Sequence, residues 1–302
     1  MKDQLPPRKR LQVPPRQELD LWLKAREERF KLRPETEKKI RWYQDQDLDS
    51  QVPLALVYVH GYSGTRRDIS PSVELLADRL HAPVFFTRLT GHGLYQDPHR
   101  GVKLSAWEQD LEEALAIGHQ LGKKVLLIGT SAGATLALWS ILKGHKAEAL
   151  ILTSPLLAAV QTGSFLLEIP FLRSVVKMFM GPWMSFPPQN ALQAEIWDYR
   201  HRTDSLLPLL TLARKVRHTS PAQIESPVLA FISPQDKVVS APTALQYLSQ
   251  IPPAKRQFVE LLPSHDKDQH VLTGEALSPD TTNLWVDTVV DFLRQRNLLP
   301  LS

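Results

Sequence analysis

A serine flanked by glycines is the pattern with the clearest chemistry in this chain. Gly129-Thr130-Ser131-Ala132-Gly133 directly follows an apolar run, residues 124–128, and precedes helix-compatible residues from Thr135 onward. A serine between a strand and a helix sits in a sharp turn that lifts its hydroxyl above the sheet edge. Glycines flank it because larger side chains would collide with the neighbouring backbone. The pattern predicts Ser131 as a nucleophile for acyl transfer.

Acyl transfer also needs N–H donors at the place where a carbonyl oxygen becomes an oxyanion. Ala132, the residue after the nucleophile, supplies one of them. The segment His60-Gly61-Tyr62-Ser63-Gly64 follows an earlier apolar run, residues 54–59. A loop after an earlier strand usually supplies the second donor. We therefore predict an oxyanion hole made by the N–H groups of Tyr62 and Ala132.

A serine nucleophile on such a turn needs an acid and a histidine later in the chain, in that order. Asp236 lies just past the apolar run 228–232, where parallel sheets carry functional groups. Two histidines, His265 and His270, lie in the loop after the last predicted strand. The spacing does not choose between them. An apolar pair after His270 can anchor its ring, so His270 is the first choice and His265 stays the alternative.

These residues need a sheet to position them, and the chain from Pro53 onward predicts one. Short apolar runs alternate with amphipathic helical segments such as 72–79 and 107–120. This alternation is typical of an α/β fold with a mostly parallel central sheet and helices on both faces. The predicted strands are 54–59, 84–87, 124–128, 149–153, 228–232 and 257–262.

The alternation is interrupted between Pro155 and about Ser220, where no strand is expected. This segment is rich in Leu, Phe, Met and Trp, and a connection of this length needs structure of its own. We read residues 155–220 as a small helical cap insertion. The core then comprises residues 51–154 and 221–302. Residues 1–50 form a basic, Pro-rich head and a polar helical extension over 17–48.

Composition limits the partners. The 302 residues include no cysteine, which excludes disulfides, thiol catalysis and thiolate metal sites. Much of the net charge of +4 lies in the head, which we expect to be solvated and flexible. The alternative is weak contact with an anionic membrane surface, through the head or the apolar cap. No aromatic residues interleave with these charges, so nucleic acid is not expected as a partner.

No secretory signal is seen, so we expect a cytoplasmic protein. The sequence predicts no metal site and no cofactor, and structural roles for His60 and His92.

Together these motifs make the chain similar to the α/β-hydrolase superfamily, in its monoglyceride-lipase, small carboxylesterase and serine-aminopeptidase-like branch. The resemblance covers roughly residues 52 to 297 and implies the α/β-hydrolase fold, with a cap domain at the place of the insertion. Relatives often carry an apolar pair and a threonine after the catalytic histidine, which strengthens His270. The residues that carry the resemblance are the two glycine-rich segments above, Arg88-Leu89-Thr90-Gly91-His92-Gly93, Trp107 with Asp110, Asp236, and His270-Val271-Leu272-Thr273.

The resulting hypothesis is a serine hydrolase that cleaves a carboxylic ester through a Ser131–Asp236–His270 triad and an acyl-enzyme. A monoacylglycerol or a short- to medium-chain carboxylester is the expected substrate. A thioesterase, an acyltransferase or a peptidase would use the same triad. The alternative from another class is a binding protein that keeps the fold without catalysis.

Overall fold

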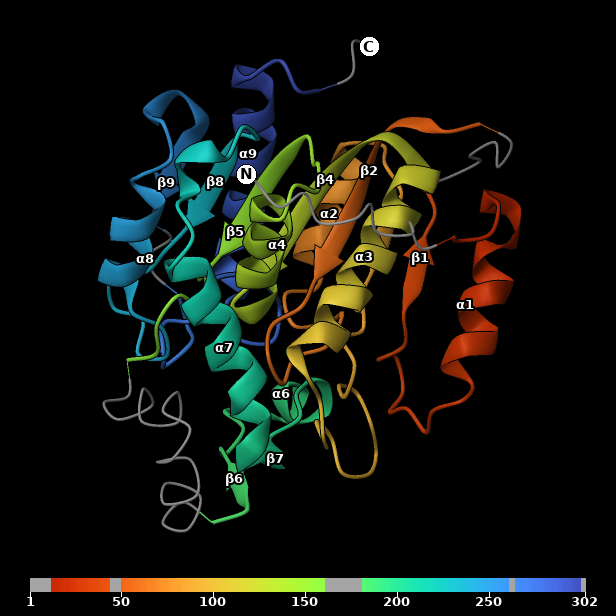
Figure 1. Cartoon of the computed structure of the whole chain (residues 1–302), viewed down its shortest axis with the longest axis vertical. Helices are drawn as coiled ribbons and strands as arrows, with labels where there is room; N and C mark the ends of the chain where they lie inside the picture. The colour runs from red at the N-terminus through yellow and green to blue at the C-terminus, as the bar shows by residue number, and fades with distance from the viewer. Residues whose placement is uncertain (1–11, 44–49, 161–180, 261–263, 300–302) are drawn as a thin grey trace, which may run out of the picture.

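A twisted, mostly parallel sheet forms the centre of the molecule (Figure 1). The computed structural model describes residues 12–43, 50–160, 181–260 and 264–299. The strand order is β1-β3-β2-β4-β5-β8-β9, and every pairing is parallel except that of β1 with β3. The strands are β1 (Lys39–Arg41), β2 (Val52–Val59), β3 (Val84–Phe86), β4 (Gly122–Thr130), β5 (Ala149–Thr153), β8 (Val228–Phe231) and β9 (Arg256–Val259).

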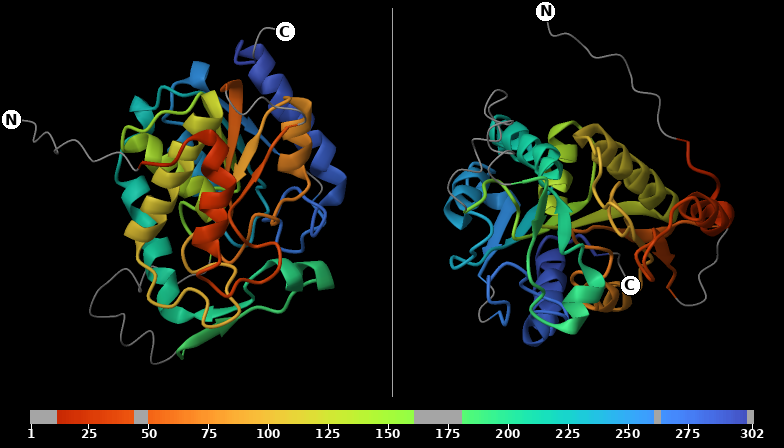
Figure 2. Two further views of the ribbon diagram at one scale, coloured as in Figure 1. Left: turned by 90° about the vertical axis from the view of Figure 1, so that its right-hand side faces the viewer. Right: turned by 90° about the horizontal axis from the view of Figure 1, so that it is seen from below.

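The central strands form because their residues are apolar on both faces. Every residue of β5 and β8 is buried, as a sheet covered on both sides requires. Helices α3 (Leu104–Leu121), α4 (Ala132–Leu142), α7 (Leu206–Arg217) and α8 (Ala241–Leu248) pack on one face, and α2 (Ser72–Arg79) and α9 (Thr282–Gln295) on the other (Figure 2). Short 3-10 turns complete the described chain at η1 (Arg16–Glu18), η3 (Thr203–Ser205), η4 (Pro221–Gln223), η5 (Pro253–Lys255) and η6 (Pro279–Thr281).

The sequence-based strands and helices agree closely with this sheet. The predicted strand 149–153 and helix 72–79 have the bounds of β5 and α2. The predicted strand 257–262 begins one residue earlier, at Arg256, and its residues 261 and 262 lie outside the described part. The α/β fold with a mostly parallel central sheet expected from the alternation is therefore confirmed.

The connection from β5 to β8 differs from the expectation in one respect. The prediction that no strand lies between Pro155 and Ser220 is wrong, because β6 (Trp183–Ser185) and β7 (Arg200–Arg202) pair antiparallel. The short helix α6 (Ala191–Ile196) lies between them, and α7 follows β7. This part lies at the lower end of Figure 1, beyond the edge where the parallel strands end. Residues 161–180, which carry much of the predicted apolar cap, lie outside the described ranges.

The segment before β2 packs onto the core. Within the described part of the range 17–48, the predicted α-helix is limited to α1 (Leu19–Glu27), and residues 39–41 form the edge strand β1 instead; residues 44–48 lie outside the described residues. Leu19 and Leu23 are fully buried against the core on the α3 side. Arg16, expected in a solvated head, is buried with its guanidinium 5.1 Å from the ring centroid of Trp42. The other basic residues of the head lie outside the described residues.

Among the described helices, none combines the length and the apolar character that crossing a bilayer would require.

Candidate active site

Ser131 occupies the turn that joins β4 to α4. Its backbone has φ +52° and ψ −116°, a region that non-glycine residues rarely adopt. The turn is held on both sides, because Ser131 N–H donates to the Thr153 carbonyl at 2.8 Å and its own carbonyl accepts from the N–H of Leu156 at 3.2 Å. The sharp strand-to-helix turn expected from the sequence is therefore present at this residue.

The glycines on either side of Ser131 are required by close backbone contacts. A Cβ atom at Gly133 would lie 2.2 Å from the Val59 carbonyl oxygen and 2.4 Å from that of His60. A Cβ atom at Gly129 would lie 2.6 Å from the backbone nitrogen of Ala134. Because the obstructing atoms belong to the backbone of β2 and α4, a side chain could fit only if these elements moved apart.

Three side chains predicted from the sequence form a continuous hydrogen-bonded chain. His270 Nε2 lies 2.9 Å from Ser131 Oγ, and His270 Nδ1 lies 2.8 Å from Asp236 Oδ2. The other carboxylate oxygen of Asp236 accepts the N–H groups of Val238 and Val239, both at 2.8 Å. The Asp236 carboxylate is therefore fixed, and a proton on Nδ1 leaves the lone pair of Nε2 facing the serine hydroxyl.

The second candidate histidine lies elsewhere. His265 Nε2 is 3.0 Å from Asp280 Oδ2, and its side chain is 58% exposed. By contrast, the His270 side chain is 12% exposed and faces both Ser131 and Asp236. Of the two histidines that the sequence left open, the structure brings only His270 to the serine.

The loop that carries Tyr62 passes directly beside Ser131. A Cβ atom built on Gly61 would lie 3.3 Å from Ser131 Cβ. Within the described ranges, the N–H groups of Tyr62 and Ala132 donate no hydrogen bond to the protein. Both are thus available to an oxygen bound next to Ser131. The Tyr62 hydroxyl pairs with Ser205 Oγ, which joins this loop to the β5–β8 connection.

A buried carboxyl group that the sequence analysis missed supports the same loop. Asp68 Oδ2 accepts the Gly61 N–H at 2.8 Å, and its Oδ1 accepts the Tyr58 hydroxyl. Burial raises the pKa of Asp68 to about 7. An aspartate among Thr65, Arg66 and Arg67 carries no sequence signal for this role, because the partner is a backbone group seven residues away.

Four histidines gather under this loop and around the Tyr62 ring. His60 Nε2 accepts the Leu89 N–H at 3.0 Å, so His60 binds backbone as its predicted structural role requires. Burial lowers the pKa of His60 to about 4 and that of His92 well below its usual value. The rings of His99 and His201 lie 4.9 and 5.1 Å from that of Tyr62. The described residues contain no group of histidine and acidic side chains that could hold a metal ion.

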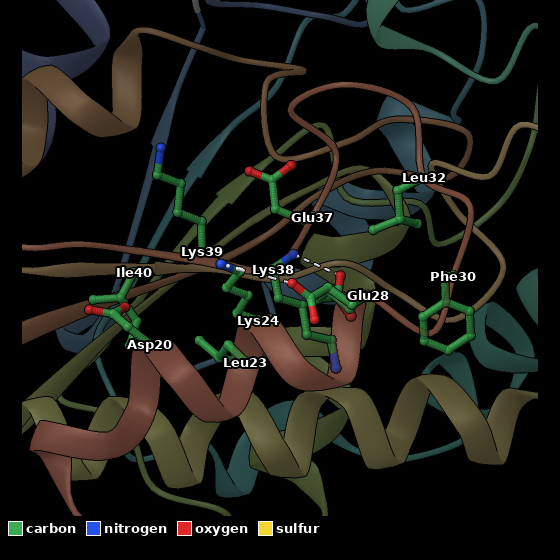
Figure 3. A pocket seen from close by; sticks show the side chains of 11 residues that line it. Asp20, Leu23, Lys24, Glu28, Phe30, Leu32, Glu37, Lys38, Lys39 and Ile40 are labelled. Atoms are coloured by element: carbon green, nitrogen blue, oxygen red, sulfur yellow. Dashed lines mark hydrogen bonds and ion pairs between the residues drawn. The ribbon is translucent and has the colours of Figure 1, made fainter.

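A cavity of about 450 Å³ is lined by residues of the N-terminal segment, from Asp20 to Ile40 (Figure 3). Charges of both signs line it, including Lys24, Glu28 and Glu37, beside the apolar side chains of Leu23 and Ile40. It lies between α1 and the chain leading into β1, and it includes none of the residues predicted for the site. This cavity is separate from the Ser131 site.

Comparisons with known proteins agree with the fold described above. The model of the alpha/beta hydrolase family matches residues 56–276. A thermostable monoacylglycerol lipase of Bacillus sp. (strain H-257) is 25% identical over 240 residues, which cover 74% of this chain and 89% of that protein. A structure of metagenome-derived lipolytic enzymes, LipS and LipT, superposes with a TM-score of 0.68 at 17% identity, covering 87% of this chain and 99% of that chain. The monoacylglycerol lipase of Paleococcus ferrophilus gives 0.61 at 15% identity, over 86% and 99% of the two chains.

Proposed function

This chain belongs to the alpha/beta hydrolase family, and on that premise we propose that it is a serine hydrolase that cleaves carboxylic esters through an acyl-enzyme. The observation that carries the proposal is the chain of contacts from Ser131 Oγ through His270 to Asp236, at 2.9 and 2.8 Å. This geometry serves nucleophilic acyl transfer, because the base touches the nucleophile and is itself oriented by a fixed acid.

In the proposed reaction, Ser131 Oγ attacks the ester carbonyl carbon while His270 Nε2 takes the hydroxyl proton. The carbonyl oxygen becomes an oxyanion and accepts the N–H groups of Tyr62 and Ala132, each worth about 3–4 kcal/mol in known cases. Collapse of the tetrahedral intermediate releases the alcohol, which receives the proton from His270. Water then attacks the acyl-enzyme with His270 as base, and release of the carboxylic acid restores Ser131. Asp236 holds the imidazole tautomer and stabilises its cation in both steps.

For the substrate, we propose an ester of a medium-chain acid, with a monoacylglycerol as the first choice. The similarity to the monoacylglycerol lipase of Bacillus supports this choice. The many Leu, Phe, Met and Trp residues of the β5–β8 connection also suit an acyl chain. By this proposal, the connection acts as a cap over Ser131.

A fluorophosphonate probe tests the chemistry, since it reacts only with an activated serine. We expect the wild-type protein to be labelled and to hydrolyse p-nitrophenyl esters, with activity rising from acetyl to octanoyl. Replacing Ser131 by Ala should remove the label and lower turnover by on the order of a millionfold. A wild-type protein that unfolds cooperatively on heating, and is therefore folded, but is neither labelled nor active would favour the alternative of a non-catalytic binding protein. A flat or falling chain-length profile would contradict the acyl-chain substrate while leaving the serine chemistry intact.

A further inference from the structure

The loop that carries His270 is organised around one buried carboxylate. Asp266 Oδ2 accepts the backbone N–H of His270 at 2.9 Å and that of Val271 at 2.8 Å. The residue is 2% exposed, and its own N–H donates to Ser264 Oγ at 3.2 Å. Gln269, which lies between Asp266 and His270 in the chain, has φ +54°. This backbone conformation is unfavourable for a non-glycine residue and needs support from its surroundings.

The second oxygen of Asp266 reaches a different part of the molecule. Asp266 Oδ1 accepts the Gln189 Nε2 amide at 2.6 Å and the Asp268 N–H at 3.1 Å. Gln189 returns a bond from its own Oε1, which accepts the Lys267 N–H at 3.2 Å. Gln189 belongs to the β5–β8 connection and directly precedes the Asn190 cap of α6. The histidine loop and the connection therefore share one carboxylate.

We propose that Asp266 is a positioning residue for His270, and that Gln189 couples the position of this histidine to the β5–β8 connection. The inference rests on the proposed function. Asp236 orients the His270 ring through Nδ1, but a ring is placed only as well as the backbone that bears it. Two N–H bonds to a charged acceptor fix that backbone, and bonds to charged acceptors are the stronger kind. A shift of about 1 Å in a catalytic group can lower a rate on the order of 100-fold.

Gln189 couples the β5–β8 connection to the carboxylate that positions His270. A displacement of the segment before α6 would pull on Asp266 Oδ1, while Asp266 Oδ2 holds the two N–H groups of the histidine segment. The rigid carboxylate transmits the movement to His270 because its two oxygens belong to one planar group. When the β5–β8 connection keeps Gln189 bonded to Asp266, the distance of 2.9 Å between His270 Nε2 and Ser131 Oγ is therefore favoured.

The test compares two acidic residues of the same loop. Asp266→Asn keeps one acceptor oxygen but turns an amide toward Gln189, and Asp266→Ala removes every bond. Asp268→Asn is the matched control, since it removes the same charge two positions away and its side chain makes no hydrogen bond within the described part of the chain. On p-nitrophenyl butyrate we expect kcat per titrated site to fall about tenfold in Asp266→Asn and about 100-fold in Asp266→Ala, with KM unchanged. Asp268→Asn should match the wild type.

Two further measurements separate positioning from folding and from the proposed chemistry. Hydrogen exchange at the amides of His270 and Val271 should quicken in Asp266→Asn and stay unchanged in Asp268→Asn, whether or not the protein is an enzyme. Gln189→Leu should lower kcat about threefold while leaving both amides protected, which keeps the test informative if Asp266→Ala does not fold. Equal kcat in Asp266→Asn and Asp268→Asn in an active protein would overturn the positioning role. Wild-type kcat in Gln189→Leu would overturn the coupling. Complete inactivity of the wild type would instead contradict the proposed function.

Discussion

Arg33 and Asp198 stand 165 positions apart in the chain and meet with 2.6 Å between Arg33 Nη2 and Asp198 Oδ1. Their side chains are 16% and 2% exposed. The same guanidinium donates to the carbonyls of Glu195 and Trp197 at 2.7 and 3.3 Å, where α6 ends. Asp198 in turn donates its N–H to the Ser63 carbonyl at 2.7 Å, in the loop that carries Tyr62. The N-terminal segment thus fastens the β5–β8 connection beside the site.

We expect Arg33→Met to lower the free energy of unfolding by about 3 kcal/mol, because it removes the guanidinium from the buried Asp198 carboxylate, which keeps His99 Nε2 at 3.2 Å as an ionisable neighbour. Urea unfolding followed by circular dichroism measures the change. Arg100→Met is the control, since Arg100 is 75% exposed and, among the described residues, its guanidinium pairs only with Asp97, three residues earlier. Adding Asp198→Asn to Arg33→Met should recover part of the loss. Equal stabilities of the two single variants would contradict the buried-pair explanation.

His270→Ala should abolish most esterase activity, by roughly 10⁴- to 10⁶-fold in kcat, because the variant loses the group that takes the proton from Ser131. His265→Ala should retain wild-type kcat, since His265 contacts Asp280 at the surface. Initial rates on p-nitrophenyl butyrate, with fluorophosphonate labelling rates as a second readout, distinguish the two. A larger loss in His265→Ala would overturn the assignment.

Gly133→Ala should be strongly destabilising, because the new methyl group meets the Val59 carbonyl oxygen at 2.2 Å. We expect a loss of more than about 2 kcal/mol, or a protein that does not accumulate in folded form, as for other overpacked sites. Gly144→Ala is the comparison, since nothing lies within 4 Å of its added Cβ and its φ of +92° carries only backbone strain. That variant should lose about 1–2 kcal/mol. Thermal unfolding of both variants gives the measurement, and a milder effect at Gly133 would be contradictory.

The parts of this molecule that sequence alone predicted are those with strong local patterns. The central strands contain continuous apolar runs, such as residues 125–128 of β4 and 149–152 of β5, so their alternation with helices could be predicted, and Ser131 lies at one of the junctions. The strands β1, β6 and β7 have three residues each and include exposed or half-buried positions, so their sequences show no hydrophobic periodicity that would predict a strand. Their existence depends on partners far along the chain, such as β3 for β1.

The same limit applies within the site. Asp236 could be predicted because it follows a strand, whereas Asp266 lies in a charged loop that looks solvated in sequence. Its carboxylate accepts a hydrogen bond from Gln189, which lies 77 positions earlier. The choice between His265 and His270 was open for a related reason, since five residues of loop can place either ring at the sheet edge. Only the tertiary fold decides which histidine reaches Ser131.

The buried histidines make the stability of the fold depend on pH. Burial lowers the pKa of His60 and of His201 to about 4 each, and that of His92 well below its usual value. A histidine with a lowered pKa binds its proton in the unfolded chain first, so stability is lost as pH falls from about 6.5 toward 4. Asp68 acts oppositely, because its raised pKa of about 7 favours the folded state at low pH. Burial also raises the pKa of Glu74 and of Asp110, so these carboxyl groups act in the same direction as Asp68 and offset part of the loss from the three histidines.

We expect the free energy of unfolding to fall between pH 6.5 and 5, with about 1.4 kcal/mol per pH unit for each histidine that stays neutral in the folded state. His201→Gln removes one of these groups and should reduce the slope by about that amount, whatever it does to stability at pH 7.5. His218→Gln is the control, because His218 is exposed. Urea unfolding at pH 7.5, 6.5, 5.7 and 5.0 measures the slopes. His201 packs against Tyr62, with ring centroids 5.1 Å apart. Protonation of His201 should therefore also weaken the contact between the β5–β8 connection and the Tyr62 loop. An unchanged slope in His201→Gln would show that His201 takes up its proton equally in the folded and unfolded chain.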